Sequence, residues 1–207
     1  MPPSGITRDQ AQEEEPFAPI WPDGETIFIR KAQPEDEAGL KRMFYRLSPR
    51  TLYQRFFSPI PLVPLQAQRV AALASVDPAR GFAVVACGRQ EIRGVARYDR
   101  EQDPRDAELS VLIEDAWQGR GLGKMMLAHV IVEARRQGIT RFIVNVLGDN
   151  RPALRVVQAL FANAEWEWDG EAWQGYLPVK SFQPLAPPAE SGSIPLDPGR
   201  RSKTEIH

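Results

Sequence analysis

Residues 114–127 of this chain read Glu-Asp-Ala-Trp-Gln-Gly-Arg-Gly-Leu-Gly-Lys-Met-Met-Leu. The stretch leads from the end of an apolar strand through a glycine loop into an amphipathic helix. Alternating glycines let the backbone approach an anion closely, and the unpaired amides of a first helical turn point their partial positive charge at it. The stretch therefore predicts a phosphate-binding loop at the start of a helix.

Two familiar phosphate loops do not fit this spacing. A Walker loop needs a glycine five residues before Gly123 and a hydroxyl after the lysine, but this chain has Gln118 and Met125 there. A dinucleotide fingerprint needs a third glycine, and a lysine or a methionine stands at the two positions where it could fall. The spacing argues against nucleoside triphosphate, nicotinamide and flavin ligands.

The pattern Gln-x-x-Gly-x-Gly, formed by Gln118, Gly121 and Gly123, resembles the pyrophosphate-binding motif of the GNAT superfamily of acetyl-CoA-dependent N-acetyltransferases. The flanks agree, because residues 107–113 and 139–147 resemble the strands on either side of that motif, and residues 149–153 resemble the start of the next helix. The resemblance implies an α/β fold, a GNAT-like mixed central sheet with helices on both faces in a single domain.

The hydrophobic pattern gives the same element order. Strands are expected near residues 26–30, 82–87, 91–99, 108–113, 142–147, 164–168 and 171–179, and helices near 34–47, 65–74, 121–138 and 152–161. The dipeptide Asp169-Gly170 predicts a tight hairpin turn between the last two strands. The order β-α-α-β-β-β-α-β-α-β-β describes a mixed sheet with helices on both faces.

Length and composition set the domain boundaries. A chain of 207 residues with 43% hydrophobic content can bury one substantial core. Residues 1–25 are rich in proline and carry three consecutive glutamates, so we expect a disordered lead. Residues 181–207 are similarly rich in proline and small residues and predict a disordered tail. The acetyltransferase domain is then expected over residues 26–180.

Charge and residue usage exclude several classes of function. A formal net charge of -1 gives no global field to attract nucleic acid or an anionic membrane. The chain shows neither a leader pattern nor an apolar run near the roughly twenty residues that span a bilayer, so the cytoplasm is the expected location. Two histidines and one cysteine argue against a metal site.

The resemblance implies which residues hold acetyl-CoA. Backbone groups of Val111, Leu112 and Ile113 would bind the pantetheine arm, because in the family this strand splays from its neighbour and leaves amides unpaired. The pyrophosphate would be surrounded by Gln118, Gly119, Arg120, Gly121, Leu122, Gly123 and Lys124, with charge from the arginine and the lysine. Asn150 resembles the family asparagine near the pantetheine, and as Asn-x-Pro it would equally be a helix cap.

Acetyl transfer also needs a base. An amine with a pKa of about 10.4 is neutral in only about one molecule in a few thousand at pH 7, and only the neutral form attacks a thioester. Glu108 is the candidate base, acting directly or through a water, because the matching position in many family members holds a carboxylate. The alternative is an exposed strand glutamate, and Asp99 and Asp115 are weaker candidates.

One position departs from the family pattern. Many members place a tyrosine seven residues beyond the asparagine to protonate the departing thiolate, and this chain has Val157 there. A thiol with a pKa of about 8.5 leaves tolerably as thiolate, and Tyr98 or Tyr53 could substitute. This departure leaves the alternative that the chain is a module that binds acyl-CoA without catalysing its transfer.

The acceptor side carries a finer resemblance. Residues 47–59, together with Glu108 and the glycine loop, are similar to the GNAT domain of the bacterial protein lysine acetyltransferases that modify acyl-CoA synthetases. This resemblance implies an amine acceptor, possibly a protein lysine, with a small amine or polyamine as the alternative. Trp166, Trp168 and Trp173 could line an acceptor groove, form a dimer contact or simply pack. The chain is expected to be a monomer or a homodimer.

Overall fold

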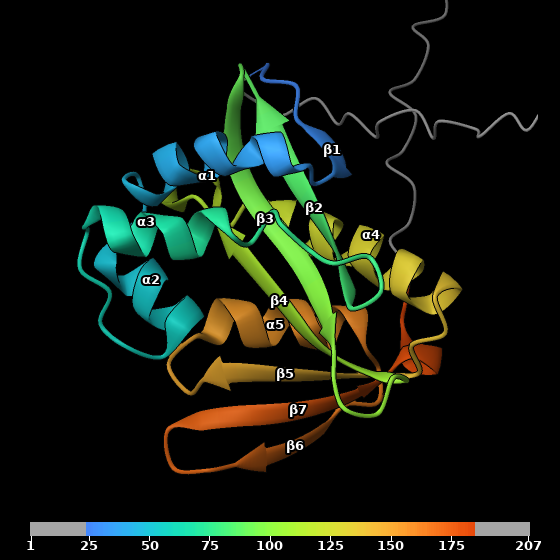
Figure 1. Ribbon diagram of the computed structural model, residues 1–207. Helices are drawn as coiled ribbons and strands as arrows, with labels where there is room; N and C mark the ends of the chain where they lie inside the picture. The colour runs from blue at the N-terminus through green and yellow to red at the C-terminus, as the bar shows by residue number, and fades with distance from the viewer. Residues whose placement is uncertain (1–23, 185–207) are drawn as a thin grey trace, which may run out of the picture.

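The computed structural model describes residues 24–184, and within them one sheet has the strand order β1-β2-β3-β4-β5-β7-β6 (Figure 1). Its strands are β1 (Phe28–Lys31), β2 (Gly81–Gly88), β3 (Glu91–Arg100), β4 (Asp106–Ile113), β5 (Arg141–Leu147), β6 (Glu165–Trp168) and β7 (Ala172–Pro178). Neighbouring strands are antiparallel except for β4 and β5, which are parallel. The predicted mixed central sheet is confirmed.

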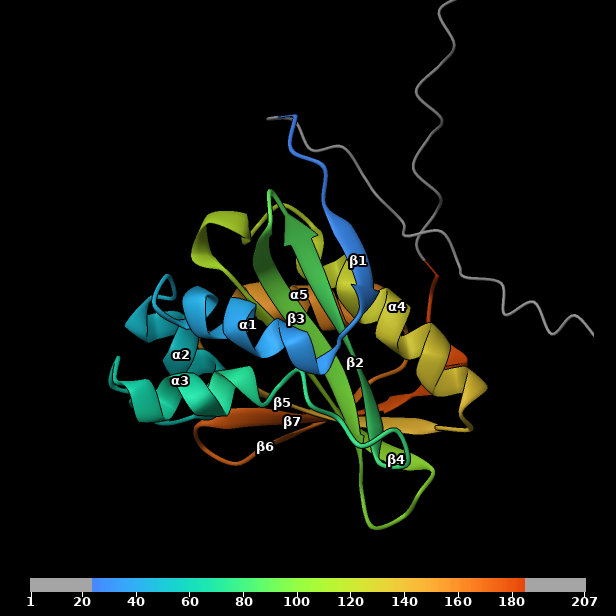
Figure 2. The same ribbon diagram turned by 45° about the horizontal axis from the view of Figure 1, so that its top comes forward.

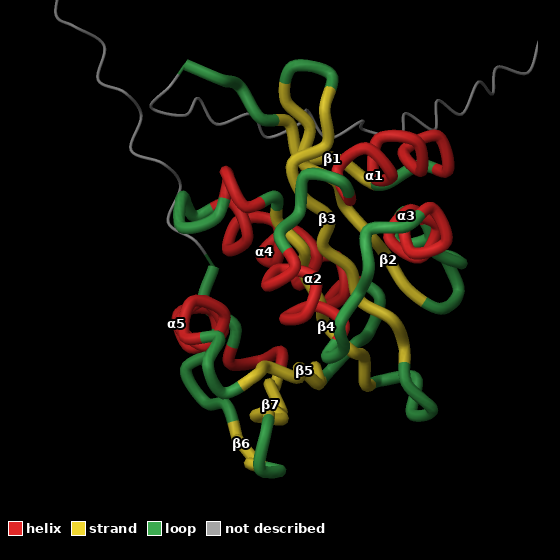
Figure 3. The backbone as a smooth tube through the Cα atoms, turned by 90° about the vertical axis from the view of Figure 1, so that its left-hand side faces the viewer, coloured by secondary structure: helices red, strands yellow, loops and turns green. Residues whose placement is uncertain are grey.

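Helices cover both faces of this sheet. The face packed by α1 (Glu37–Phe44), α2 (Pro49–Phe56) and α3 (Pro64–Ala71) lies opposite the face packed by α4 (Leu122–Arg136) and α5 (Arg151–Leu160) (Figures 2 and 3). Successive strand residues point to opposite faces, so Val85 joins the core under α1 and α3 while Val84 joins the core under α4 and α5. Burial on both faces explains why the central strands are near-continuous apolar runs.

The helix after the glycine loop, α4, packs on the sheet through one apolar face. The side chains of Met126, Leu127, Val130, Ile131 and Ala134 are all buried in the α4 core. The spacing of three and four residues therefore identified the face of α4 that packs on the sheet.

The first helical region differs from the prediction of one helix over residues 34–47. A 3-10 turn over Pro34–Asp36 precedes α1, which ends at Phe44, and α2 is a separate helix. The hydroxyl oxygen of Ser48 accepts a hydrogen bond from the backbone amide of Thr51 (3.2 Å), with proline at the first helical position. Serine followed by proline is a standard helix start, so the sequence contained the signal for α2.

The last hairpin forms as expected, but its turn lies one residue later. The backbone amide of Asp169 donates to the carbonyl of Ala172 (3.2 Å), which leaves Gly170 and Glu171 as the central pair instead of Asp169-Gly170. Gly170 has a φ of 103°, and the Asp169 carboxylate accepts the amides of Glu171 (2.9 Å) and Ala172 (2.7 Å). Asp169, the first residue of the turn, therefore stabilises it through its side chain.

The folded part reaches slightly past the predicted boundaries. Glu25, expected in the lead, is 8% exposed and lies 3.4 Å from Arg93. Phe182, expected in the tail, forms a β-bridge with Phe161. Most of the predicted lead and tail, residues 1–23 and 185–207, lies outside the described residues. Between residues 24 and 184, no helix is long and apolar enough to cross a membrane.

Candidate active site

The site begins where β4 and β5 separate. The two strands pair only from Asp106 opposite Arg141 to Glu108 opposite Ile143, although β4 continues to Ile113 and β5 to Leu147. β4 stays paired with β3 along its whole length, so it is the β5 side of β4 that loses its partner. A cavity of about 790 Å³ opens there, a volume within the range of small-molecule sites. The splay that the resemblance implied is present.

The cavity has walls from five parts of the fold, and Asp169 and Ala172 of the last hairpin also line it. The lining residues are Glu108–Ile113 of β4, Val144–Val146 of β5, Asn150 with several residues of α5, glycine-loop residues with Lys124, and Thr51, Gln54, Arg55, Phe56 and Phe57 from the α2 side. The cavity thus extends from the glycine loop to α2, so a ligand on the glycine loop and a ligand beside α2 would share one space.

Most of the predicted cofactor residues meet in this cavity, but two do not line it. Those that do are Val111, Leu112, Ile113, Gln118, Gly119, Gly121, Gly123, Lys124 and Asn150. Leu122 is fully buried in the α4 core, so its side chain is unable to reach a ligand. The Arg120 guanidinium lies over the Trp117 ring, 4.9 Å from its centroid. The backbone of Leu122 and Arg120 still belongs to the glycine loop, and their part in binding the pyrophosphate stays a prediction.

The glycine loop has the backbone that an anion site needs. Gly119 and Gly121 adopt left-handed φ values of 71° and 88°, which side-chain-bearing residues adopt at a cost. The first α4 hydrogen bond runs from the Met125 amide to the Gly121 carbonyl (3.1 Å). The amides just before Met125 therefore have no acceptor within the helix and carry the positive end of its dipole. Lys124 adds a cation to the same wall.

The side chain of Gln118 serves the protein rather than a ligand. Its Nε2 donates to the hydroxyl of Thr51 (2.9 Å) and to the carbonyl of Ile113 (3.1 Å), which uses both amide hydrogens. Gln118 therefore fixes the loop against β4 and α2. Its backbone, and not its side chain, would contact a phosphate.

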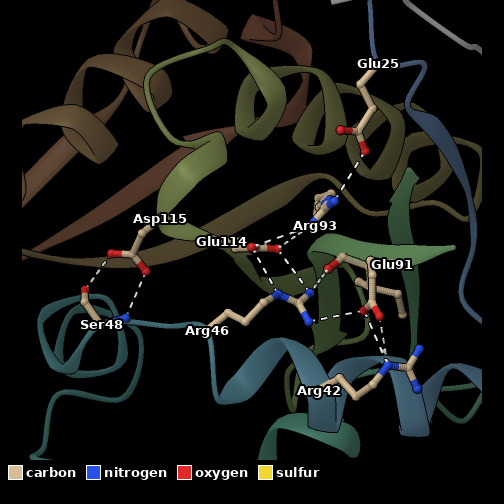
Figure 4. A network of polar contacts seen from close by, with 9 residues as sticks. Glu25, Arg42, Arg46, Ser48, Glu91, Arg93, Glu114 and Asp115 are labelled. Carbon is tan, nitrogen blue, oxygen red and sulfur yellow. Dashed lines mark hydrogen bonds and ion pairs between the residues drawn. The ribbon is translucent and has the colours of Figure 1, made fainter. Parts of the chain in front are cut away.

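A buried ionic network supports the entrance of the loop (Figure 4). Glu114, 6% exposed, accepts hydrogen bonds from Arg46 (3.1 Å) and Arg93 (3.2 Å). The Arg93 guanidinium also lies over the Trp117 ring, 5.5 Å from its centroid. A carboxylate with two guanidinium partners is the paired arrangement that a buried charge requires. The network holds the residues that lead into the glycine loop.

Glu108 lies at the point where the strands part, and its side chain is exposed on the cavity wall. The β3–β4 register places Asp99 opposite Glu108 and Arg97 opposite Ser110, so the four side chains share one face. Arg97 and Asp99 bond to each other (2.7 Å), which leaves Glu108 as the carboxylate of this group that lines the cavity. The candidate base thus faces the shared space.

Sequence reasoning missed Arg55, which lies on the cavity wall near Glu108. Its NH2 donates to the Ser110 hydroxyl (3.1 Å). Burial lowers the pKa of the Arg55 guanidinium, and the nearby Glu108 carboxylate partly opposes this effect. Thr51 and Arg55 are four residues apart on α2 and therefore share one helix face. Recognition of α2 as a helix would have placed Arg55 on the same face as Thr51.

The positions of the tyrosines bear on which residue could act as the general acid. Val157, 6% exposed, lines the cavity where the family tyrosine was expected. Tyr98 is 1% exposed and packs near Phe82 and Phe142, while the hydroxyl of Tyr53 donates to Glu171 (2.9 Å). No tyrosine between residues 24 and 184 lines the cavity.

The remaining candidates have structural roles. The side-chain oxygen of Asn150 accepts the Ala153 amide (3.2 Å), so this residue both caps α5 and lines the cavity. Trp168 and Trp173 stack with their ring centroids 5.0 Å apart, and Trp166 packs against Gly175. None of these three tryptophans lines the cavity, which favours packing over an acceptor groove. In the described part of the chain, no cluster of three or more His, Cys, Asp or Glu side chains could hold a metal.

Comparison with known proteins gives a consistent result. Residues 44–161, more than half of the chain, match the model of the acetyltransferase (GNAT) family. The chain is 32% identical over 120 residues to acetyltransferase PA5475 of Pseudomonas aeruginosa, covering 56% of this chain and 63% of that protein. It is 32% identical over 144 residues to acetyltransferase Pat of Mycolicibacterium smegmatis, covering 67% of this chain and 42% of that one. The matched segments thus span less than two thirds of either relative.

Solved structures agree with the family match. The GNAT domain of S. lividans PAT superposes with a TM-score of 0.67 at 26% identity, covering 78% of this chain and 95% of that domain. The structure of yncA from Salmonella typhimurium with its cofactor acetyl-CoA superposes with a TM-score of 0.58 at 22% identity, covering 74% and 94% of the two chains. At that identity, the second likeness shows the fold.

Proposed function

The chain belongs to the acetyltransferase (GNAT) family, and we propose that it transfers the acetyl group of acetyl-CoA to the side-chain amine of a lysine in an acceptor protein. One observation carries the proposal: the unpaired side of β4, the glycine loop and the Glu108 carboxylate all face one cavity. This arrangement offers a binding surface for the donor and a base for the acceptor within the same space.

The donor site follows from the backbone. Beyond Glu108, the side of β4 that faces β5 has no strand partner, so it can hydrogen-bond the amides of a pantetheine arm as a strand would. The first turn of α4 and the Lys124 side chain would take the pyrophosphate. The donor would then run along β4 with its thioester near the point of splay.

Glu108 would accept the proton of the acceptor ammonium, directly or through a water. The neutral amine then attacks the thioester carbonyl and a C–N bond forms. The nitrogen gives up a second proton to solvent, and the C–S bond breaks to release the amide and the thiolate of CoA. Because Val157 supplies no proton, the sulfur would leave as thiolate, which a thiol pKa of about 8.5 permits. The cavity walls orient the two reactants, and this positioning itself accelerates the reaction.

An exposed apolar segment that begins at the α2 wall of the cavity supports a protein acceptor. Phe57 lines the cavity and is 37% exposed. It begins the α2–α3 connection, which runs along the outer edge of the molecule on the left of Figure 1. Leu62 and Val63 of this connection are 46% and 41% exposed, and Leu65 in the first turn of α3 is 73% exposed. Contiguous exposed apolar residues mark interaction surfaces. A small amine would need only the cavity, whereas a protein would also cover this segment.

Changing Leu62 and Leu65 to serine separates the two acceptor classes. We expect KM for a protein acceptor to rise about tenfold, because truncating the few interface side chains that carry most of the binding energy costs more than about 1 kcal/mol each. Turnover of a free polyamine should stay unchanged, since neither leucine lines the cavity. The measurement compares kcat/KM for a purified acyl-CoA synthetase and for spermidine. Val132→Ser, at a 42% exposed position on α4, is the matched control. Equal losses with both acceptors would contradict a protein-specific surface.

Val157 favours a second candidate, a module that binds acyl-CoA without catalysis. Such a module would bind acetyl-CoA tightly but release no free CoA with any protein or small-amine acceptor. A thiol-reactive dye that follows CoA release distinguishes this candidate from an enzyme, because only transfer frees the thiol.

A further inference from the structure

We propose that Asp115, Thr51 and Gln118 are positioning residues that join the donor and acceptor sides of the cavity. In this arrangement, acetyl-CoA on the glycine loop also stabilises helix α2, which forms the acceptor wall. The inference rests on the proposed donor site and adds a physical link between the two substrates.

Asp115 connects the start of α2 to the segment before the glycine loop. Its carboxylate accepts hydrogen bonds from the Ser48 amide (2.9 Å), the Ser48 hydroxyl (2.6 Å) and the Thr51 hydroxyl (2.9 Å). Figure 4 shows Asp115 reaching Ser48 from that segment. Burial acts to raise the pKa of Asp115, but these hydrogen bonds outweigh it and hold the pKa below its usual value. The charged carboxylate therefore favours the attached position of α2.

Thr51 closes the link on the other side of the same turn. Its hydroxyl donates to Asp115 and accepts from Nε2 of Gln118 (2.9 Å), which also holds the carbonyl of Ile113 (3.1 Å). Thr51 is 7% exposed, so losing these partners would leave a buried hydroxyl unsatisfied. One side chain of the acceptor wall thus contacts the first residue of the 3-10 turn Asp115–Trp117 and the residue that follows the turn, Gln118.

A parallel contact ties the end of the α1 region to the same segment. Arg46, which precedes α2, donates to Glu114 (3.1 Å), the residue next to Asp115 (Figure 4). Adjacent carboxylates therefore hold both sides of the connection between α1 and α2. A ligand that restrains this segment would restrain the connection through both contacts.

Helix α2 depends on such contacts. It has eight residues, of which Thr51 and Leu52 are buried, and a helix of this length is marginal on its own. Its other polar side-chain contacts with the rest of the fold include Arg55 with Ser110 (3.1 Å), which is partly buried. Two more, Tyr53 with Glu171 (2.9 Å) and Arg50 with Asp149 (3.8 Å), are exposed. The order of α2 should therefore follow the order of the glycine loop. Such coupling is reciprocal, so an acceptor held by α2 would strengthen acetyl-CoA binding by the same factor.

Hydrogen exchange read by mass spectrometry on the full chain tests this link without an acceptor. In the wild type, saturating acetyl-CoA should slow exchange at residues 118–125 and also slow it about fivefold or more at residues 49–57, the lower end of typical coupling factors. Thr51→Val keeps the size of the side chain and removes the hydrogen bonds of its hydroxyl with Ser48, Asp115 and Gln118. In this variant the slowing at 118–125 should persist, and the slowing at 49–57 should disappear.

Thr140→Val is the matched control, because that hydroxyl bonds the Arg105 carbonyl (3.4 Å) away from the cavity. It should keep both responses. If Thr51→Val does not fold by circular dichroism, Asp115→Ala breaks the same link from the loop side.

The outcomes separate the inference from the function. Retained slowing at 49–57 in the folded variant, or no slowing there in a wild type that binds acetyl-CoA by calorimetry, would overturn the link alone. A wild type that does not bind acetyl-CoA would overturn the proposed donor site and the link with it.

Discussion

Glu108→Gln is expected to lower kcat by about 10²- to 10⁴-fold, the usual contribution of a general base. The amide keeps the shape of the side chain at the point of splay but has no capacity to take the ammonium proton. Affinity for acetyl-CoA should stay the same, because the proposed donor contacts are the backbone of β4 and the glycine loop. The measurement is steady-state release of CoA with a lysine-bearing acceptor, together with calorimetric binding of acetyl-CoA.

Glu101→Gln is the matched control for this charge removal. Glu101 follows β3, is exposed and does not line the cavity, so this variant should turn over as the wild type does. Full activity of Glu108→Gln would remove Glu108 from the mechanism. A loss of acetyl-CoA binding in that variant would instead show that the side chain holds the donor site together.

Gly123→Glu is expected to weaken acetyl-CoA binding by about 100-fold or more. It places a carboxylate beside the proposed pyrophosphate position, and juxtaposed like charges cost several kcal/mol, with each 1.4 kcal/mol equal to about a factor of ten. Gly123 suits this test better than Gly121. A Cβ at Gly123 would meet Ile113 at 3.5 Å, an ordinary contact, whereas the φ of 88° at Gly121 would strain any side chain. The measurement is the Kd for acetyl-CoA by calorimetry.

Gly123→Ala controls for the added side chain without its charge. It should fold at least as well as the wild type, because alanine is favoured over glycine in a helix by about 1 kcal/mol. It should lose much less affinity than the glutamate variant. Equal affinity of the wild type and Gly123→Glu would mean that the donor phosphates bind elsewhere.

Features of the fold that depend on local interactions could be predicted from the sequence. The glycine loop, the amphipathic face of α4 and the order of strands and helices along the chain rest on backbone freedom and on periodicity, which a window of residues contains. The same reasoning accounts for the buried side chain of Leu122, since Leu122, Met126 and Val130 follow at intervals of four and share the buried face.

The rest depended on contacts between distant segments. Asp115 and Thr51 are 64 residues apart, and nothing in either local sequence indicates their hydrogen bond. Arg55 was missed for a related reason, because its place beside Glu108 requires both the α2 helix and its packing over β4. The exposed segment after Phe57 is apolar in sequence, and only the fold leaves it uncovered.

The most direct test of the account follows the acetyl group itself. The full chain is incubated with acetyl-CoA labelled in the acetyl carbons and either a purified bacterial acyl-CoA synthetase or spermidine, and each product is analysed by mass spectrometry. The account predicts label on lysine side chains of the protein, at a kcat/KM above that for spermidine, and its loss with Glu108→Gln. Label on spermidine alone would contradict the protein acceptor, and no label on either acceptor from a chain that binds acetyl-CoA would contradict the transferase.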